Sequence, residues 1–190
     1  MRWSKTDNND SKIEPIREAI QSALMYADSR LGNTGMVPQA LYGCKIDSSH
    51  INNDSYIVDG LECGQICAAI NAQPPLIRAW LHFCYGPNDS KHDQGEVAIY
   101  VMWANFTGIG AKLWDKHVRF CEIAALDYKC RVIAGRSLPA ETYYPAVGTV
   151  HNHWRRDWGR KLNLCLDTIS GYDDRGLQGV SGVVSRICHR

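Results

Sequence analysis

A stripe of large apolar side chains recurs every three or four residues between residues 147 and 169, with basic side chains between its members. This spacing is the period of one helix face, so the stretch predicts a helix that buries one side and exposes the other. Gly148, near the start of this stretch and before the predicted helix, predicts a tight turn. The apolar positions are Trp154, Trp158, Leu162, Cys165, Leu166 and Ile169, and the basic positions are Arg155, Arg156, Arg160 and Lys161.

The rest of the chain shows the same period. It predicts further helices over residues 11–32, 56–72, 75–85, 96–106, 113–134 and 173–188. The 96–106 stretch is also rich in strand-forming residues, and we assign it to a helix. Residues 41–55 and the segment PNDSKHDQG have no such period and are expected to be loops. The pattern therefore predicts an all-α protein of six or seven helices.

The last predicted helix carries glycine at positions 176, 179 and 182. Glycine weakens an exposed helix interior by about 1 kcal/mol relative to alanine. Either this helix packs closely against a neighbour, or it is less regular than its apolar positions suggest.

Charge divides the chain into two regions. Residues 1–110 contain eight Lys and Arg against twelve Asp and Glu, whereas residues 111–190 contain thirteen against eight, and the whole chain has a net charge of +1. We therefore separate a mildly acidic helical region, 1–110, from a basic one, 111–190. Phosphate contacts, if the protein makes any, are expected in the basic region, although a solvated basic face explains the same asymmetry.

The chain begins MRWSKTDNNDS, without the apolar run of a secretory signal, and nowhere contains eighteen consecutive apolar residues. We expect a cytoplasmic protein that does not enter a membrane. The eight cysteines include no CxxC pair and fall mostly in apolar surroundings. In a reducing compartment they are interpreted as small buried side chains.

Residues 140–166 have the pattern of a helix-turn-helix unit. Val147 and Gly148 would form the turn, Trp154 would fix the second helix against the first, and the exposed side would carry polar and basic groups. Pro145 interrupts the helix expected before the turn. Arginine and asparagine can read guanine and adenine in the major groove of double-stranded DNA. The candidate DNA-binding residues are Thr149, His151, Asn152, Arg155, Arg156, Arg160 and Lys161, with the last two nearest phosphate. An ordinary amphipathic helix is the competing interpretation.

Several motifs over residues 57–187 resemble small bacteriophage DNA-binding proteins of the late-gene antitermination (Q-like) type. They are LIRAWLHFCYGP, the DYK turn at 127–129, VGTVHNHWRRDW and the final LQGVSGVV. The resemblance implies a transcription regulator in a bacterial host cell that binds DNA near a late promoter, engages RNA polymerase and makes it read through terminators. Proteins of this type often carry zinc sites made of cysteines. Because this chain has no CxxC pair, we do not extend that expectation to it.

Other functions stay open. The same tryptophan and arginine residues could dock a protein partner. Zinc could bind Cys63 with Cys67, His117 with Cys121, or His151 with His153, but no two pairs form a finger spacing. A metal-dependent nuclease would need clustered acids, and the chain contains no phosphate-binding or nucleophile motif. We therefore expect no cofactor and no catalysis. The candidate acids are Asp89 with Asp93, Glu122 with Asp127, and Asp173 with Asp174.

Overall fold

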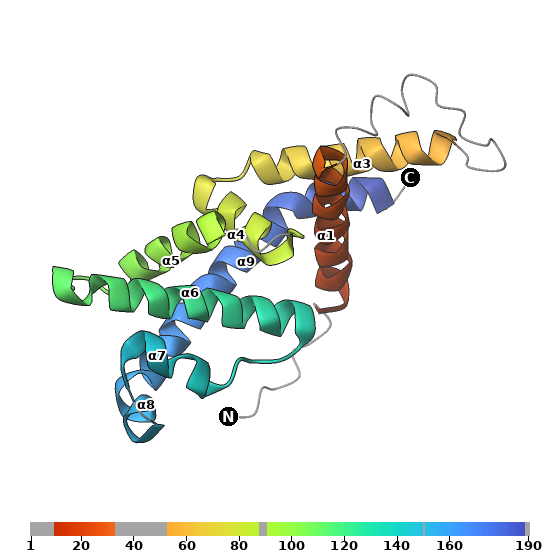
Figure 1. The fold of residues 1–190 in the computed structure, drawn as a ribbon. Helices are drawn as coiled ribbons and strands as arrows, with labels where there is room; N and C mark the ends of the chain where they lie inside the picture. Colours follow the sequence, from red (N-terminus) through yellow and green to blue (C-terminus); the bar gives the residue numbers. More distant parts are fainter. Residues whose placement is uncertain (1–9, 33–52, 88–90, 150, 189–190) are drawn as a thin grey trace. The chain divides into compact units, whose positions relative to one another are not determined.

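The computed structural model describes residues 10–32, 53–87, 91–149 and 151–188. Within these ranges the chain forms eight α-helices and one 3₁₀ turn and has no strand, which confirms the all-α prediction (Figure 1). The helices are α1 (Asp10–Gly32), α3 (Asn53–Asn71), α4 (Pro75–Tyr85), α5 (Lys91–Asn105), α6 (Ala111–Ala134), α7 (Tyr144–Val147), α8 (His151–Asp157) and α9 (Gly159–Cys188), with the 3₁₀ turn η1 (Ala140–Thr142) before α7.

Two expected loops differ from the structure. Residues 53–55 belong to α3, while 41–52 lie outside the described residues. The KHDQG part of the second loop is the first turn and a half of α5. Asp93 lies in that first turn, where a negative charge favours a helix start, and Gln94 Nε2 donates a hydrogen bond to the Glu122 carbonyl at 3.1 Å. A contact between distant segments therefore stabilises a stretch without an apolar period.

The helices divide into two compact units. The first contains residues 1–73, 85–87 and 177–190, and the second contains residues 74–84 and 88–176. The boundary at residue 110 that charge suggests stays a prediction.

The first unit is organised around α1 and α3. Their buried side chains include Ile20 and Ala23 on α1 and Ile66 and Ile70 on α3. Arg17 Nε donates a hydrogen bond to the Tyr85 hydroxyl at 3.2 Å. Ile66 and Ile70 are thus buried on the face that the sequence predicts for α3, whereas Leu61, expected on the same face, is 63% exposed.

The second unit places α5 and α6 side by side, with α7 next to α6 and α8 next to η1 (Figure 1). Trp80 is completely buried, and its Nε1 donates a hydrogen bond to Asp173 Oδ1 at 3.0 Å. Gly176 is also buried in this unit, because an added Cβ would come within 2.8 Å of Leu81. The glycine at 176 therefore reflects close packing, the first of the two explanations that its spacing allows.

Candidate nucleic-acid interface

The turn before α8 is built around Gly148. Its φ of 55° lies in the left-handed region, and its backbone N–H caps α7 by donating to the Tyr144 carbonyl. Pro145 stands at the start of α7, where a helix tolerates proline, and Gly148 ends this helix after only four residues. The predicted turn is present, and the helix before it is one turn long.

Two tryptophans fix the segment after the turn to α6. The Trp154 and Trp158 rings lie 6.2 and 4.8 Å from the Phe120 ring, and Trp154 also lies 5.0 Å from Tyr143. Phe120 is completely buried, and the two tryptophans are 7% and 6% exposed. The apolar stripe found in the sequence is therefore the buried side of this segment.

The predicted single helix over this stretch is broken, which corrects the sequence interpretation. α8 ends at Asp157, and α9 begins at Gly159. Helical backbone hydrogen bonds of 2.9 Å still cross the break, from the Trp158 N–H to the Trp154 carbonyl and from the Leu162 N–H to the Trp158 carbonyl. Gly159 follows this break directly, and glycine weakens a helix interior. From there α9 runs without interruption to Cys188, so the segment predicted separately over 173–188 is part of the same helix.

A buried carboxylate connects α6 to the segment that leads into the turn. Asp127 is completely buried and accepts hydrogen bonds from Arg131 Nη2 at 2.7 Å, the Leu138 backbone N–H at 2.6 Å and the Tyr143 hydroxyl at 2.9 Å. Burial, together with the neighbouring Asp127 charge, raises the pKa of Tyr143, so its hydroxyl stays protonated and donates. This network positions η1 and α7 against α6.

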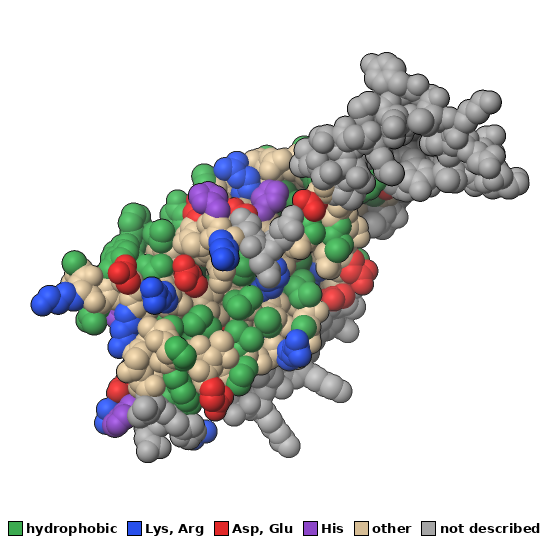
Figure 2. Space-filling model, viewed as in Figure 1, with side chains coloured by type: hydrophobic (Ala, Val, Ile, Leu, Met, Phe, Trp, Pro, Cys, Tyr) green, Lys and Arg blue, Asp and Glu red, His purple; other side chains and the backbone are tan. Residues whose placement is uncertain are grey.

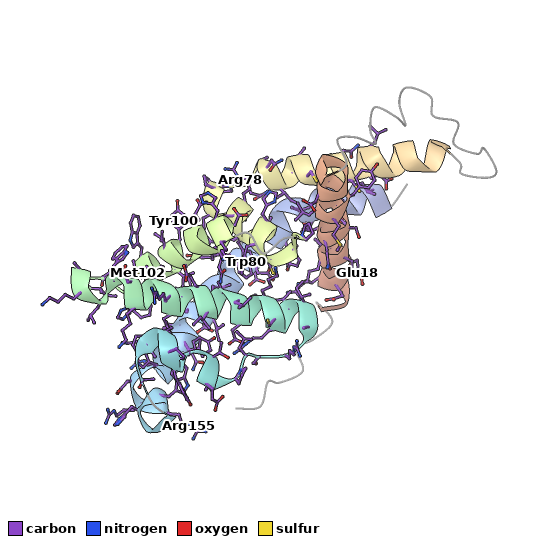
Figure 3. All side chains as sticks on the ribbon, viewed as in Figure 1. Glu18, Arg78, Trp80, Tyr100, Met102 and Arg155 are labelled. Carbon is purple, nitrogen blue, oxygen red and sulfur yellow. The ribbon has the colours of Figure 1, made fainter. Side chains whose placement is uncertain are left out.

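The predicted DNA-binding side chains differ in exposure. Arg155, Arg156 and Arg160 are exposed, as expected from their place off the stripe, whereas Lys161 and Thr149 are half-buried. Arg155 lies at the outer side of α8 (Figure 3). His151 and Asn152 begin α8, but their side chains lie outside the described residues.

Arg156 is paired within its own helix. Its Nε and Nη2 donate to the two carboxylate oxygens of Asp157 at 2.7 and 3.1 Å, and Nη2 also lies 3.1 Å from His153 Nδ1. These bonds hold the pKa of the Asp157 carboxyl below its ordinary value. Asp157 is exposed, so it adds a negative charge to the candidate surface that the sequence interpretation did not weigh.

Two lysines from different helices lie over the Trp158 ring. Lys161 Nζ is 4.2 Å from the ring centre, and Lys116 Nζ, from α6, is 5.4 Å from it. Lys116 is forty-two positions from Trp158 in sequence and shares no local pattern with it, so no sequence signal could identify it. It is the basic residue that the sequence interpretation missed.

His117 is buried between this site and the core. Its Nδ1 is 2.9 Å from the Leu113 carbonyl, and its ring centre is 5.2 Å from that of Trp158. Burial lowers the pKa of His117, and the charges of Lys161 and Lys116 lower it further. The imidazole is therefore neutral at neutral pH.

The cysteine and acid pairs do not assemble a metal site in the part of the chain that is described, where no three His, Cys, Asp or Glu side chains group suitably. Cys121 and Cys165 are completely buried, with their sulfur atoms 4.0 Å apart. The bond to Cys165 and burial raise the pKa of the Cys121 thiol. These thiols are core side chains, as the sequence suggested. Of the helices described, none is long and apolar enough to cross a membrane.

A protein partner docking on the 151–161 stretch would meet arginines and few indole atoms, because Trp154 and Trp158 are buried. Among the described residues, the exposed indoles lie elsewhere: Trp103 on α5 is 59% exposed and Trp114 on α6 is 37% exposed. Figure 2 shows apolar side chains gathered over α5, where Ile99 is the other large exposed one.

The candidate interface is thus the exposed basic side of residues 155–161, fixed to α6 by two buried tryptophans. We call Arg155, Arg156, Arg160 and Lys161 the basic surface. Comparison of the chain with protein-family models, curated proteins and solved structures finds no significant match.

Proposed function

We propose that this protein binds double-stranded DNA through the basic surface. The observation that supports it is the pair of arginines, Arg155 and Arg160, which are exposed and have no ion-pair partner among the residues that the structure describes. They lie five residues apart on either side of the break at Trp158, on a segment anchored by this buried side chain. Unneutralised guanidinium groups are well suited to phosphate oxygens.

Phosphate contacts should dominate over base contacts. α8 has seven residues and is therefore only about 10 Å long. It presents few side chains to a groove, and base contacts would come from its beginning, at His151 and Asn152, and from Thr149 before it. Contacts to phosphate position a protein without reading sequence, so we expect moderate sequence preference and strong salt dependence.

Arg155→Ala and Arg160→Ala test this proposal. Each should weaken binding to a labelled random duplex roughly tenfold, because each removes one charge-assisted contact. Each should also make the affinity less dependent on salt, by about one unit in the slope of log K against log salt concentration. Fluorescence anisotropy at several salt concentrations measures both quantities.

Arg136→Ala is the matched control. Arg136 is exposed, belongs to the same unit and follows the other end of α6. Its loss removes the same charge and should leave the affinity unchanged. Equal losses from all three variants would show that total charge, and not this surface, governs binding, and binding by all variants at the parent level would contradict the proposal.

We further propose that the DNA-binding activity serves transcription. This narrower proposal is supported only by the resemblance of residues 57–187 to phage late-gene antitermination proteins, which implies RNA polymerase as a second partner.

A further inference from the structure

Lys116 and Lys161 place two positive charges around one indole ring, that of Trp158. Both ammonium groups lie over the same indole ring, at 5.4 and 4.2 Å from its centre, so they cannot be farther apart than the sum of these distances. One comes from α6 and the other from α9. The fold therefore brings together two charges that repel each other.

The Trp158 ring that both lysines approach is held in place by its neighbours. Trp158 is 6% exposed and packs against Phe120, with ring centres 4.8 Å apart, and against His117. Attraction to the indole face holds each lysine stem near this position and reduces the freedom that an ammonium group would otherwise lose on binding a ligand. The lysine pair, Lys116 and Lys161, is thus partly preorganised.

The nearby acid does not neutralise the pair. Asp157 is four residues before Lys161, but both of its oxygens accept bonds from Arg156. Neither lysine forms an ion pair within the described part of the chain. His117 is neutral and adds no third charge. Hydrogen bonding to Arg156 does most to lower the pKa of the Asp157 carboxyl and Lys161 contributes less, so Asp157 offsets the charge of the lysine pair only in part.

We propose that the lysine pair is a seat for one phosphate group, bound by both ammonium groups beside the Trp158 ring. A tetrahedral dianion or backbone phosphate offers several acceptor oxygens, so it can accept from two donors and relieve their repulsion. If the phosphate belongs to DNA, the inference rests on the proposed function. A free phosphate or pyrophosphate offers the same acceptor oxygens and could bind the same two lysines. It adds α6 to an interface otherwise built from α8 and α9.

The first arm of the test uses inorganic pyrophosphate on the full chain. Lysine side-chain NMR should show saturable shifts of the Lys116 and Lys161 signals together, with Lys112, exposed on α6, as the internal control. Shifts shared equally by Lys112 would indicate general screening and would overturn the seat.

The second arm is a double-mutant cycle in DNA binding. Lys116→Gln and Lys161→Gln should each lose roughly fivefold in affinity, and the double variant little more than either, because both act on one phosphate. If the affinity loss of the double variant equals the product of the two single losses, the lysines make two independent contacts and the seat is overturned. The seat is also overturned if both single variants bind DNA with the affinity of the parent. Lys116→Arg and Lys161→Arg keep the charge and should recover most binding, which separates loss of charge from loss of folding.

The two arms distinguish the possible failures. If the parent protein binds no DNA while pyrophosphate shifts both lysines, the seat stands as a site for free phosphate and the proposed function fails. If DNA binding depends on Arg155 and Arg160 while pyrophosphate shifts neither lysine, the seat fails and the proposed function stands.

Discussion

At the scale of single residues, Asp157 opposes the function proposed for its neighbours. It is exposed beside Arg155 and Arg156, and it holds the Arg156 guanidinium in two hydrogen bonds. A carboxylate here repels phosphate and also occupies the arginine that the sequence pattern places on the DNA side. Arg156 can therefore contribute fully only when this pair opens.

Asp157→Asn should strengthen DNA binding by about threefold, since it removes a repulsive charge and weakens the hold on Arg156. The free energy of unfolding should hardly change, because exposed ion pairs contribute little to stability. Anisotropy titrations against the parent measure the effect. Asp174→Asn, an exposed acid fourteen residues beyond Arg160 on α9, is the control and should bind like the parent. Weaker binding by Asp157→Asn would show that the carboxylate positions the arginine for DNA.

At the scale of elements, periodicity identified many of the buried side chains of the long helices but not where every helix ends. Leu61 on α3 and Leu113 on α6, both expected on apolar faces, are 63% and 49% exposed. Trp154, Trp158 and Ile169 are buried as their spacing predicts. The break in the helix at Trp158 could not be predicted, because the apolar stripe continues through it. The start of α5 at Lys91 depends partly on a bond from Gln94 to α6, which local sequence does not encode.

The candidate site shows the same limit. Exposure of Arg155 and Arg160 follows from a local pattern and was predictable. The pairing of Arg156 with Asp157 depends on rotamers, and the approach of Lys116 to Trp158 depends on how α6 packs. Neither has a spacing that a sequence pattern could detect.

The Asp127 network should decide how firmly η1 and α7 are held on α6. Asp127→Asn replaces one acceptor oxygen with an amide donor that faces Arg131 and the Tyr143 hydroxyl. We expect a loss of about 2–4 kcal/mol in the free energy of unfolding, because a buried charged network is left partly unpaired. Urea denaturation followed by tryptophan fluorescence measures it.

Tyr143→Phe is the milder partner variant. It keeps the ring against Trp154 and removes only one hydrogen bond, so it should cost about 1–2 kcal/mol. Because the folded protein raises the pKa of Tyr143 above its ordinary value of 10.0, this residue stabilises the fold below that pH and less as pH rises past it. The phenylalanine variant should therefore lose less stability at alkaline pH than the parent. A larger loss from Tyr143→Phe than from Asp127→Asn would show that the carboxylate is not the centre of the network.

At the scale of the whole molecule, a net charge of +1 gives little long-range attraction to a polyanion. DNA binding must then depend on local charge, which in the second unit gathers where α6, α8 and the beginning of α9 meet. A few phosphate contacts support only modest affinity for random DNA. If the protein is a regulator, as we propose, this surface would need either sequence preference from the start of α8 or a second partner bound at the same site.

That requirement allows a direct test of the transcription proposal. A duplex sequence selected by the protein from a random pool is placed between a promoter and a terminator, and purified bacterial RNA polymerase transcribes the template. An antiterminator should increase readthrough severalfold on this template and not on one with a scrambled site, because it must be held near the polymerase to act. Arg155→Ala and Arg160→Ala should not increase readthrough at protein concentrations at which the parent gives its maximal increase. Reduced initiation without added readthrough would identify a repressor, and DNA binding with no change in either would refute a role in transcription.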